Sequence, residues 1–411
     1  APAPVATTRV ERTSSRRYRR TPALTAAPDS PDVRVATRKG NLMNNAFGTF
    51  PVHHAMFLAA TLVAHLHPPS SSRAQLSQFY GRGKGNRLRL LPRMLRDVSH
   101  REMGVTLLGG RERLSLPIGI APTAMQRMAH PEGEAATARA ARDAGTLMIV
   151  STIATTSLED VREAAPDGRR WFQLYVYRDR DVTRALVQRA EQAGYSALVL
   201  TVDTPYFGQR LADVRNKLAL PPGLKMANFK EADFQNVAPA AGGGSGLSTY
   251  ASALFDPSLT WKDVDWLKSI THLPVIIKGI LRADDAAEAV DHGAAAILVS
   301  NHGARQIDGE PSTIECLPEV VRAVAGRCEV YLDGGVRCGT DVAKALCLGA
   351  KAVFIGRPVL WGLAYTGKEG VDHVLAILRL ELDRAMGLLG CRTISDLTPD
   401  LVVREEHFSK L

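Results

Sequence analysis

Short apolar runs alternate with amphipathic, helix-like stretches from about residue 117 onward. The runs contain few polar residues, which is typical of parallel strands that are covered on both faces. Eight such runs lie at residues 118–121, 147–151, 171–174, 197–201, 275–278, 296–300, 330–332 and 352–355. Helical patterns lie between and after them, at 132–144, 158–164, 179–193, 261–269, 283–292, 315–324, 340–348 and 371–388. Eight strand–helix units predict an α/β fold of the (β/α)8 TIM-barrel type. A doubly wound sheet, with its usual five or six strands, is the alternative.

Two segments fall outside this repeat. The connection between Pro205 and Leu259 is about 55 residues long and contains a glycine-rich run at 241–246. Such a length in a barrel is typical of an active-site lid or a partly disordered loop, so we expect one after the fourth strand. Residues 1–75 are rich in Ala, Pro, Thr, Ser and Arg, a composition that resembles a transit peptide. We predict a disordered or misassigned extension at 1–75 and one barrel domain at 76–411.

The charge and cysteine patterns narrow the classes of function. The net charge is +9, but residues 1–75 hold ten Lys and Arg against three Asp and Glu, whereas the rest of the chain holds 41 against 39. The basic excess therefore does not indicate a nucleic-acid surface on the barrel. No apolar run approaches the roughly 20 residues of a membrane span. The five cysteines form no C-x-x-C pair or zinc spacing, which predicts no metal site and favours a reducing compartment.

The chain ends in Ser409, Lys410 and Leu411. A C-terminal S-K-L tripeptide is the address that the peroxisomal import receptor recognises. We therefore expect a peroxisomal protein that binds this receptor.

The sixth apolar run leads into S-N-H-G-A-R-Q at residues 300–306. Catalytic groups of α/β barrels lie at the carboxyl ends of the strands, where this pattern places His302. Arg305, three residues further on, offers a guanidinium that can bind a carboxylate through two hydrogen bonds. A lone His and Arg at this spacing also occur in ordinary surface loops. Together with the polar groups that follow the other strands, they predict a base and a substrate clamp for a small carboxylic acid.

The last two strands end in glycine and arginine. Gly334, Gly335 and Arg337 follow the seventh strand, and Gly356 and Arg357 follow the eighth. Adjacent glycines let the backbone approach a bound anion, and barrels commonly bind phosphate here, near the N-terminus of a short helix. These residues predict a phosphate site, although a tight turn with two surface arginines is the alternative.

Charged and polar groups also end the third, fourth and fifth strands. Lys278 needs a compensating partner if it is buried, and a flat ring that gains negative charge on reduction would supply one. Asp203 is placed to face His302 across the barrel mouth, where a carboxylate would orient the imidazole. Tyr175 can donate a hydrogen bond to a developing oxyanion, and Arg210 adds a second cation for a carboxylate.

Taken together, the strand ends resemble the FMN-dependent (S)-2-hydroxy-acid oxidase family, whose members include glycolate oxidase. The resemblance covers roughly residues 85–411. The stretches that carry it are A-P-T-A-M-Q-R-M-A-H-P-E-G-E at 121–134, F-Q-L-Y-V-Y at 172–177, T-V-D-T-P at 201–205, L-P-V-I-I-K-G at 273–279, S-N-H-G-A-R-Q at 300–306, D-G-G-V-R-C-G at 333–339 and I-G-R-P at 355–358.

By position, the resemblance implies a role for each residue at the strand ends. His302 would be the catalytic base, with Asp203 as its partner. Tyr175 would take part in catalysis and bind substrate, and Arg210 and Arg305 would bind the substrate carboxylate. The implied FMN contacts are Pro122, Thr123, Ala124, Ser151, Gln173, Thr201, Lys278, Ser300, Asp333, Gly334, Gly335, Arg337, Gly356 and Arg357.

Two positions depart from the family pattern. Members that prefer glycolate have a Trp just after the second strand end, where this chain has Ile153. The smaller side chain predicts a wider pocket in which Ile153 contacts the substrate. Phe79, within a poorly matching segment, lies where a substrate-binding Tyr is expected. Both departures resemble the relatives that prefer long-chain acids.

The resemblance implies a homo-oligomer that oxidises (S)-2-hydroxy acids to 2-oxo acids and reduces dioxygen to hydrogen peroxide. Two alternatives stay open: a dehydrogenase of the same site that uses another electron acceptor, and a catalytically impaired barrel subunit. No haem-binding module is recognisable before the barrel and no membrane segment is found, which favours the oxidase.

Overall fold

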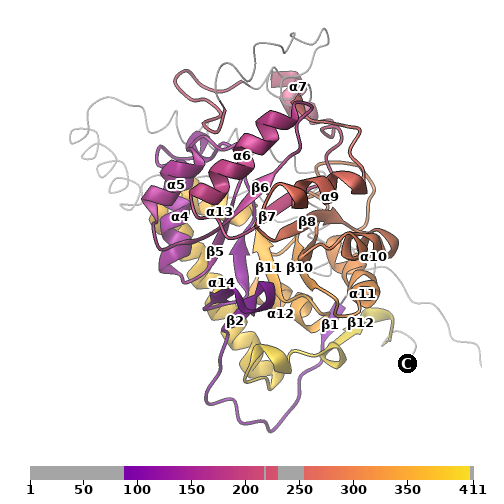
Figure 1. The fold of residues 1–411 in the computed structure, drawn as a ribbon. Helices are drawn as coiled ribbons and strands as arrows, with labels where there is room; N and C mark the ends of the chain where they lie inside the picture. Colours follow the sequence, from indigo (N-terminus) through magenta and orange to yellow (C-terminus); the bar gives the residue numbers. More distant parts are fainter. Residues whose placement is uncertain (1–87, 217–218, 230–253, 408–411) are drawn as a thin grey trace, which may run out of the picture. The chain divides into compact units, whose positions relative to one another are not determined.

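The structure is a computed structural model that describes residues 88–216, 219–229 and 254–407. Eight parallel strands pair edge to edge and close into a barrel, in the order β10-β11-β4-β5-β6-β7-β8-β9 (Figure 1). They are β4 (Ile118–Ile120), β5 (Leu147–Val150), β6 (Arg169–Leu174), β7 (Leu198–Thr201), β8 (Val275–Ile280), β9 (Ala296–Val299), β10 (Glu329–Asp333) and β11 (Ala352–Ile355). The predicted TIM barrel is therefore confirmed.

Helices follow the strands along the chain and pack around the barrel (Figure 1). Those that the sequence predicted are α4 (Gly133–Asp143), α5 (Leu158–Ala164), α6 (Arg180–Gln192), α9 (Trp261–Ser269), α10 (Ala283–Asp291), α11 (Thr313–Val324), α12 (Gly339–Cys347) and α14 (Lys368–Leu389). Their observed ends lie within about two residues of the predicted ones, except that α14 begins three residues earlier.

Helix α13 (Arg357–Thr366) was not predicted. Pro358 and Gly362 within it are residues that usually mark turns. Proline is tolerated here because it lies in the first turn, where its missing N–H has no helical partner. Gly362 lets α14 approach, since a Cβ there would lie 2.4 Å from the carbonyl oxygen of Gly370. The two apparent helix breakers therefore serve the start of the helix and its packing.

The barrel strands are apolar on both faces because one face lines the interior and the other packs against the helices. In β5, Leu147 and Ile149 belong to the interior cluster with Trp171, whereas Met148 and Val150 belong to the cluster between strands and helices. All of these side chains are buried. This double burial explains the continuous apolar runs in the sequence.

Three aromatic side chains fill the barrel interior. The rings of Trp171, Tyr331 and Phe354 pack with centroids 5.6 to 5.9 Å apart. Phe354 pairs across the strands with Gly119 of β4. A Cβ on Gly119 would lie 2.5 Å from the Phe354 ring, so glycine makes room for it.

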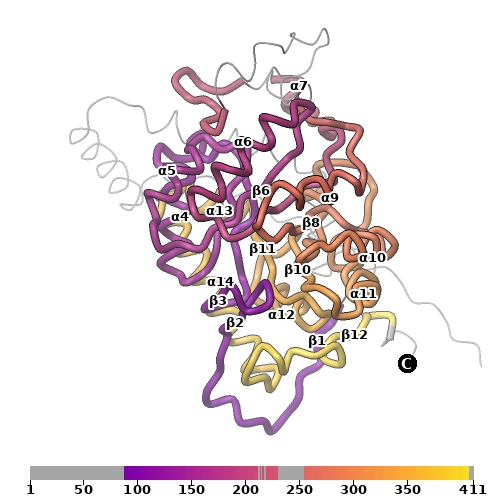
Figure 2. The backbone as a smooth tube through the Cα atoms, viewed as in Figure 1, coloured from indigo at the N-terminus to yellow at the C-terminus, as the bar shows by residue number. Residues whose placement is uncertain are grey.

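Two small sheets outside the barrel were not predicted. β2 (Val105–Leu107) and β3 (Glu112–Leu114) form a hairpin whose tip donates two backbone N–H groups to Glu329, at the start of β10. The hairpin covers the amino-terminal end of the barrel and leaves the carboxyl ends of the strands for a pocket. β1 (Leu88–Leu90) pairs with β12 (Val402–Arg404), so the two ends of the described chain meet, as Figure 2 shows.

Several predicted features lie outside the described residues: the extension at 1–75, Phe79, the glycine-rich run at 241–246 and the terminal tripeptide 409–411. Part of the long connection after β7 is described, including the short helix α7 (Leu211–Asn216). Among the described helices, none has the length and apolar character needed to cross a membrane.

We expect Gly119→Ala to lower the free energy of unfolding by about 1–3 kcal/mol, because the added methyl overpacks the barrel interior against Phe354. Urea unfolding of the purified protein measures the loss. In the Phe354→Leu variant, which lacks the ring, adding Gly119→Ala should lower the free energy of unfolding by less than it does in the wild type. Gly104→Ala is the control, because a Cβ there would lie 3.6 Å from its nearest neighbour, an ordinary contact. Equal midpoints for both alanine variants would contradict the packing argument.

Candidate active site

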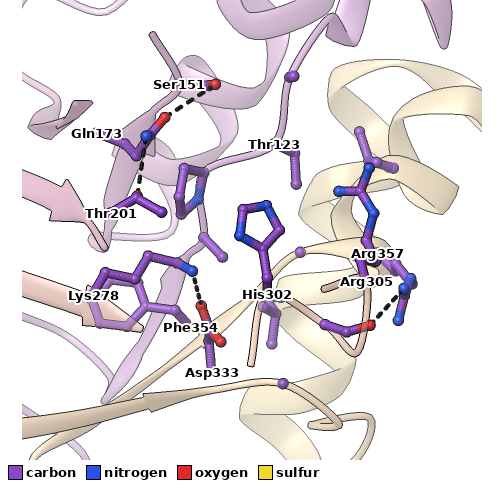
Figure 3. Close-up of a pocket in the computed structure, with 18 of the residues that line it drawn as sticks. Thr123, Ser151, Gln173, Thr201, Lys278, His302, Arg305, Asp333, Phe354 and Arg357 are labelled. Carbon is purple, nitrogen blue, oxygen red and sulfur yellow. Dashed lines mark hydrogen bonds and ion pairs between the residues drawn. The ribbon is translucent and has the colours of Figure 1, made fainter. Parts of the chain in front are cut away.

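A pocket opens at the carboxyl ends of the barrel strands (Figure 3). The predicted site residues that line it are Pro122, Thr123, Ala124, Ser151, Ile153, Gln173, Tyr175, Thr201, Arg210, Lys278, His302, Arg305, Asp333, Gly334, Gly335, Arg337, Gly356 and Arg357. Asp203 and Ser300, also predicted, are not part of the lining but contact His302 and Lys278 from behind it. Lining residues that were not assigned a role are Ala121, Met125, Phe207, Asp213, Gly303, Val336, Phe354, Ile355 and Leu360.

The loop after β9 holds His302 in a strained backbone conformation. His302, Gly303 and Ala304 have φ of 54°, 71° and 57°, in the left-handed region that residues other than glycine rarely adopt. Such strain costs about 1–3 kcal/mol per residue and persists only where neighbouring contacts impose it. Ser300 Oγ accepts the N–H of His302 at 3.1 Å, and Arg357 donates to the carbonyl of Gly303 at 2.9 Å. These contacts place the imidazole in the pocket.

Asp203, at the end of β7, orients the imidazole. Nδ1 of His302 lies 2.8 Å from Oδ1 of Asp203 and 3.2 Å from the hydroxyl oxygen of Thr204. An ionised carboxylate can only accept a hydrogen bond, so Nδ1 carries the proton and Nε2 keeps its lone pair. Burial disfavours the charged ring and lowers the pKa of His302, and Asp203 offsets this effect only in part. The arrangement provides a neutral imidazole with a free acceptor nitrogen.

Lys278 balances two carboxylates in the barrel mouth. Nζ donates to Ser300 Oγ at 2.7 Å and lies 3.7 Å from Asp203 and 3.6 Å from Asp333. Burial opposes the ammonium, but the two carboxylates outweigh it and raise the pKa of Lys278. Burial likewise opposes the Asp203 carboxylate, yet His302 and Lys278 hold its pKa below the usual range. Lys278 therefore has protein partners, and a ligand ring is not needed to compensate its charge.

Buried polar side chains from three strand ends form one hydrogen-bonded row. Ser151 Oγ donates to Gln173 Oε1 at 3.3 Å, and Gln173 Nε2 donates to Thr201 Oγ1 at 3.1 Å. Figure 3 shows the row along one side of the pocket, with His302 between this row and the side that holds Arg305 and Arg357. Such a row offers donors and acceptors to the edge of a flat polar ring.

Guanidinium groups crowd the opposite side of the pocket. Burial, then Arg210 and Arg357, lower the pKa of Arg305 to about 9. Burial, then Arg337, lower the pKa of Arg357 to about 10. Buried like charges are costly unless anions bind between them. The Nε atoms of Arg210, Arg305 and Arg357 have no hydrogen-bond partner within the described protein. This side of the pocket therefore suits anionic groups.

Backbone groups add to the anion site beside Arg357. Gly334 and Gly335 have φ of 87° and 83°, a conformation that glycine adopts at little cost. α13 begins directly after Gly356, and the first N–H groups of a helix attract phosphate because they lack helical partners. The charge, the glycines and the helix start fit a phosphate, and the polar row fits a ring edge. The residues present therefore fit FMN.

Tyr175 and Ile153 form part of the remaining wall. The ring of Tyr175 stacks on Phe255 with centroids 4.2 Å apart, and burial raises its pKa to about 12. The hydroxyl is therefore a hydrogen-bond donor at neutral pH. Ile153 is buried and, with Phe207, gives the wall an apolar surface.

Gln306, Thr204 and Leu360 are among the residues that help to build the site and were not predicted. Gln306 donates to the carbonyls of Asp203 at 2.6 Å and Tyr206 at 2.9 Å, which ties the loops after β7 and β9 together. Thr204 donates to Oδ1 of Asp203 at 2.8 Å. Gln306 and Thr204 lie inside the motifs quoted above, next to residues that were assigned a role, and this adjacency could have identified them. Leu360 lies on α13, which was not predicted, so no sequence pattern pointed to it. Among the described residues, no cluster of three or more His, Cys, Asp or Glu could hold a metal ion.

Comparisons with known proteins agree on one family. Residues 77–404 match the family model described as FMN-dependent dehydrogenase. The chain is 54% identical to 2-hydroxyacid oxidase 1 of Homo sapiens over 319 residues, 77% of this chain and 85% of the human protein. It is also 54% identical to an L-lactate oxidase of Nostoc sp. over 314 residues, 76% and 85% of the two chains. The crystal structure of mandelate oxidase with (S)-4-hydroxymandelic acid superposes with a TM-score of 0.73 at 43% identity, covering 84% and 91%.

We expect the His302 ring of the flavin-free protein to titrate below 6.5, with its neutral proton on Nδ1. The ring is then neutral at pH 7 and becomes protonated only as the pH falls through its lowered pKa. Asp203→Asn removes a charge that favours the protonated ring and should move the titration lower still. Nitrogen-15 NMR of the histidine side chains measures the tautomer and the pKa. His292, which pairs with Asp265 instead, serves as the internal control. An upward shift of His302 in the variant would contradict the assignment.

Proposed function

The chain belongs to the FMN-dependent dehydrogenase family, and we propose from its site what it acts on and which residues do the work. It oxidises (S)-2-hydroxy acids to 2-oxo acids, with FMN as the cofactor and dioxygen as the electron acceptor. One observation carries this conclusion: the neutral imidazole of His302 lies between a cluster of guanidinium groups and a polar row suited to a flat ring. The two relatives and the structural neighbour are named oxidases, which favours dioxygen over another acceptor.

FMN supplies a two-electron acceptor when it is bound. Arg337, Arg357 and the first turn of α13 would hold its phosphate. The polar row at the ends of β5, β6 and β7 would meet the edge of its ring. Lys278 stays protonated between its two carboxylates and would favour negative charge on the ring. The other residues assigned to FMN from the sequence remain proposed contacts.

The remaining groups would bind the substrate and receive its proton. Arg305 and Arg210 are placed to bind the substrate carboxylate, and the Tyr175 hydroxyl can donate to the oxygen that is oxidised. His302 accepts the proton that the substrate loses, through Nε2. Asp203 then stabilises the imidazolium, since it stays ionised and already accepts the Nδ1 proton.

The apolar wall around Ile153 favours substrates larger than glycolate. An indole at this position would fill space that Ile153 leaves open. A substrate with an aliphatic tail gains contact there, at about 0.8 kcal/mol for each buried methylene. For a substrate with a tail of several carbons, this gain at Ile153 exceeds the contact energy that glycolate would gain from an indole at position 153.

Three further proposals rest on the sequence alone. Residues 76–411 form one catalytic domain. Ser409, Lys410 and Leu411, which lie outside the described residues, direct the protein to the peroxisome through the import receptor. The protein assembles as a homo-oligomer.

We expect His302→Gln to slow anaerobic reduction of the bound flavin by about 10²–10⁴-fold, because no positioned base accepts the substrate proton. Flavin content should stay near that of the wild type, since His302 lies outside the phosphate site. Stopped-flow bleaching of the flavin absorbance with an excess of lactate or 2-hydroxyoctanoate measures the rate, and a peroxide assay in air follows turnover. His292→Gln, at a distant surface pair, is the control. Near-normal bleaching in the His302 variant would remove this residue from the mechanism.

We expect Ile153→Trp to shift the ratio of kcat/KM values toward glycolate and away from longer 2-hydroxy acids by about tenfold or more, or about 1.4 kcal/mol. The indole fills the space that an aliphatic tail would occupy. Steady-state peroxide release across glycolate, lactate and longer acids gives the ratio. Ile153→Leu, which conserves volume, should leave it nearly unchanged. If the Trp and Leu variants give the same ratio, position 153 does not select the substrate.

A further inference from the structure

Glu134 is a buried carboxylate that the proposed chemistry does not use. It is the second residue of α4 and is 0% exposed. Oε1 accepts the backbone N–H groups of Gln126 and Thr155, both at 2.9 Å. Oε2 accepts the hydroxyl groups of Thr155 at 2.9 Å and Thr156 at 2.8 Å. All of these partners are neutral, so the carboxylate is held by several hydrogen bonds and by its place in the first turn of a helix.

These hydrogen bonds join two loops that form one wall of the pocket. Gln126 belongs to the loop after β4, and Thr155 belongs to the loop after β5. Between the same loops, the N–H of Met125 donates to the carbonyl of Ile153 at 3.2 Å, and both residues line the pocket. Glu134 therefore ties the backbone of the two loops together close to the place where a ligand would bind.

A second contact from α4 fixes a side chain that reaches the pocket. Thr137, one turn after Glu134, donates to Oε1 of Gln126 at 2.6 Å. Nε2 of Gln126 donates in turn to Oγ1 of Thr123 at 2.8 Å, and Thr123 lines the pocket. The helix thus fixes both the backbone and the side chain of Gln126 and, through it, Thr123.

The loop after β4 depends on such outside contacts. Its regular structure is one 3-10 turn, η2 (Gln126–Met128), which is preceded by Met125 with φ of 57° in the left-handed region. The loop lies so close to α4 that a Cβ on Gly133 would be 2.8 Å from the backbone nitrogen of Arg127. A strained conformation of this kind persists only where neighbouring groups impose it. The carboxylate of Glu134 accepts the N–H of Gln126, which directly follows the strained Met125.

We propose that Glu134 is a positioning residue for cofactor binding: through the loops after β4 and β5 it holds Thr123 and the adjoining wall in the shape that accepts FMN. The inference rests on the proposed role of Thr123 as an FMN contact. A role in stability alone is the alternative, and Glu112 illustrates it. Glu112 is also a buried carboxylate, but it accepts from Trp171 and Ser196 at the amino-terminal end of the barrel, away from the pocket.

The test compares the two buried carboxylates in flavin-free protein titrated with FMN, with quenching of flavin fluorescence as the readout. Glu134→Met keeps the length of the side chain but removes both acceptor oxygens, which leaves two backbone N–H groups without partners. The dissociation constant for FMN should rise by about tenfold or more. Glu112→Met is the matched control: it should lower the thermal midpoint of the flavin-free protein and leave the FMN dissociation constant within about twofold, because the sites are distant.

Two further variants separate positioning from folding. Glu134→Gln keeps one oxygen that can accept both backbone N–H groups, so its dissociation constant should fall between those of the wild type and Glu134→Met. Thr137→Val removes the hydroxyl that holds the Gln126 side chain and should raise the dissociation constant several-fold. It leaves one buried acceptor unpaired, so the thermal midpoint should fall less than in Glu134→Met, which leaves several groups unpaired.

Unchanged FMN affinity in Glu134→Met overturns the inference and leaves Glu134 a structural carboxylate. If Glu134→Met does not fold, unchanged affinity in Glu134→Gln, which loses one of the two acceptor oxygens, has the same meaning. A wild-type chain that binds no FMN overturns the proposed function. A wild-type chain that binds FMN as tightly as Glu134→Met does overturns only the inference about Glu134.

Discussion

The ammonium of Lys278 is the charge on which the rest of the site depends. It lies inside the barrel mouth, within 4 Å of Asp203 and Asp333, where an isolated carboxylate would take up a proton to avoid the cost of burial. A protonated Asp203 could still orient His302, but it could not stabilise a positive charge on the ring. Because His302 and Lys278 together keep Asp203 ionised, the imidazole has a partner whose charge favours accepting a proton. The lysine reaches this place because β8 runs between β7, which leads to Asp203, and β9, which leads to Ser300 and His302, while Asp333 ends β10 on the far side of β9.

The pKa values of the guanidinium groups shift in the opposite direction from that of Lys278. Lys278 is compensated within the protein, whereas burial and mutual repulsion lower the pKa values of Arg305 and Arg357. Their positive charge is therefore stabilised when anions bind, and not by folding alone. This division gives the pocket one charge-balanced region around His302, where we propose that a proton is transferred, and one positive region suited to a carboxylate and a phosphate. Both regions are held at fixed distances by strands whose register the closed barrel sets.

Much of the fold and of the site could be predicted because both follow from the strands. A strand that is buried on both faces shows as a continuous apolar run, and the residue after it lies at the rim of the pocket, as His302 does. What could not be predicted depends on contacts between segments far apart in the chain. α13 was missed because Gly362, which looks like a break, is explained only by its approach to α14. The compensation of Lys278 by Asp333 requires knowing that β8 and β10 flank β9. The β2–β3 hairpin is too short to show a pattern of its own.

The strand ends and the loop that holds Ile153 differ in how freely their residues can be substituted. The groups that move charge stand at strand ends, and shifting one of them would disturb the register of the barrel. The wall around Ile153 belongs to the loop after β5, and the Ile153 side chain does not make the contacts that fix the backbone of this loop. The carbonyl of Ile153 accepts the N–H of Met125, and Glu134 accepts the N–H of Thr155, two residues further on. A substitution at position 153 can therefore alter the size of the pocket while the loop keeps its path. Under the proposed roles, substitution at position 153 changes the substrate preference without moving His302, the arginines or the residues assigned to FMN.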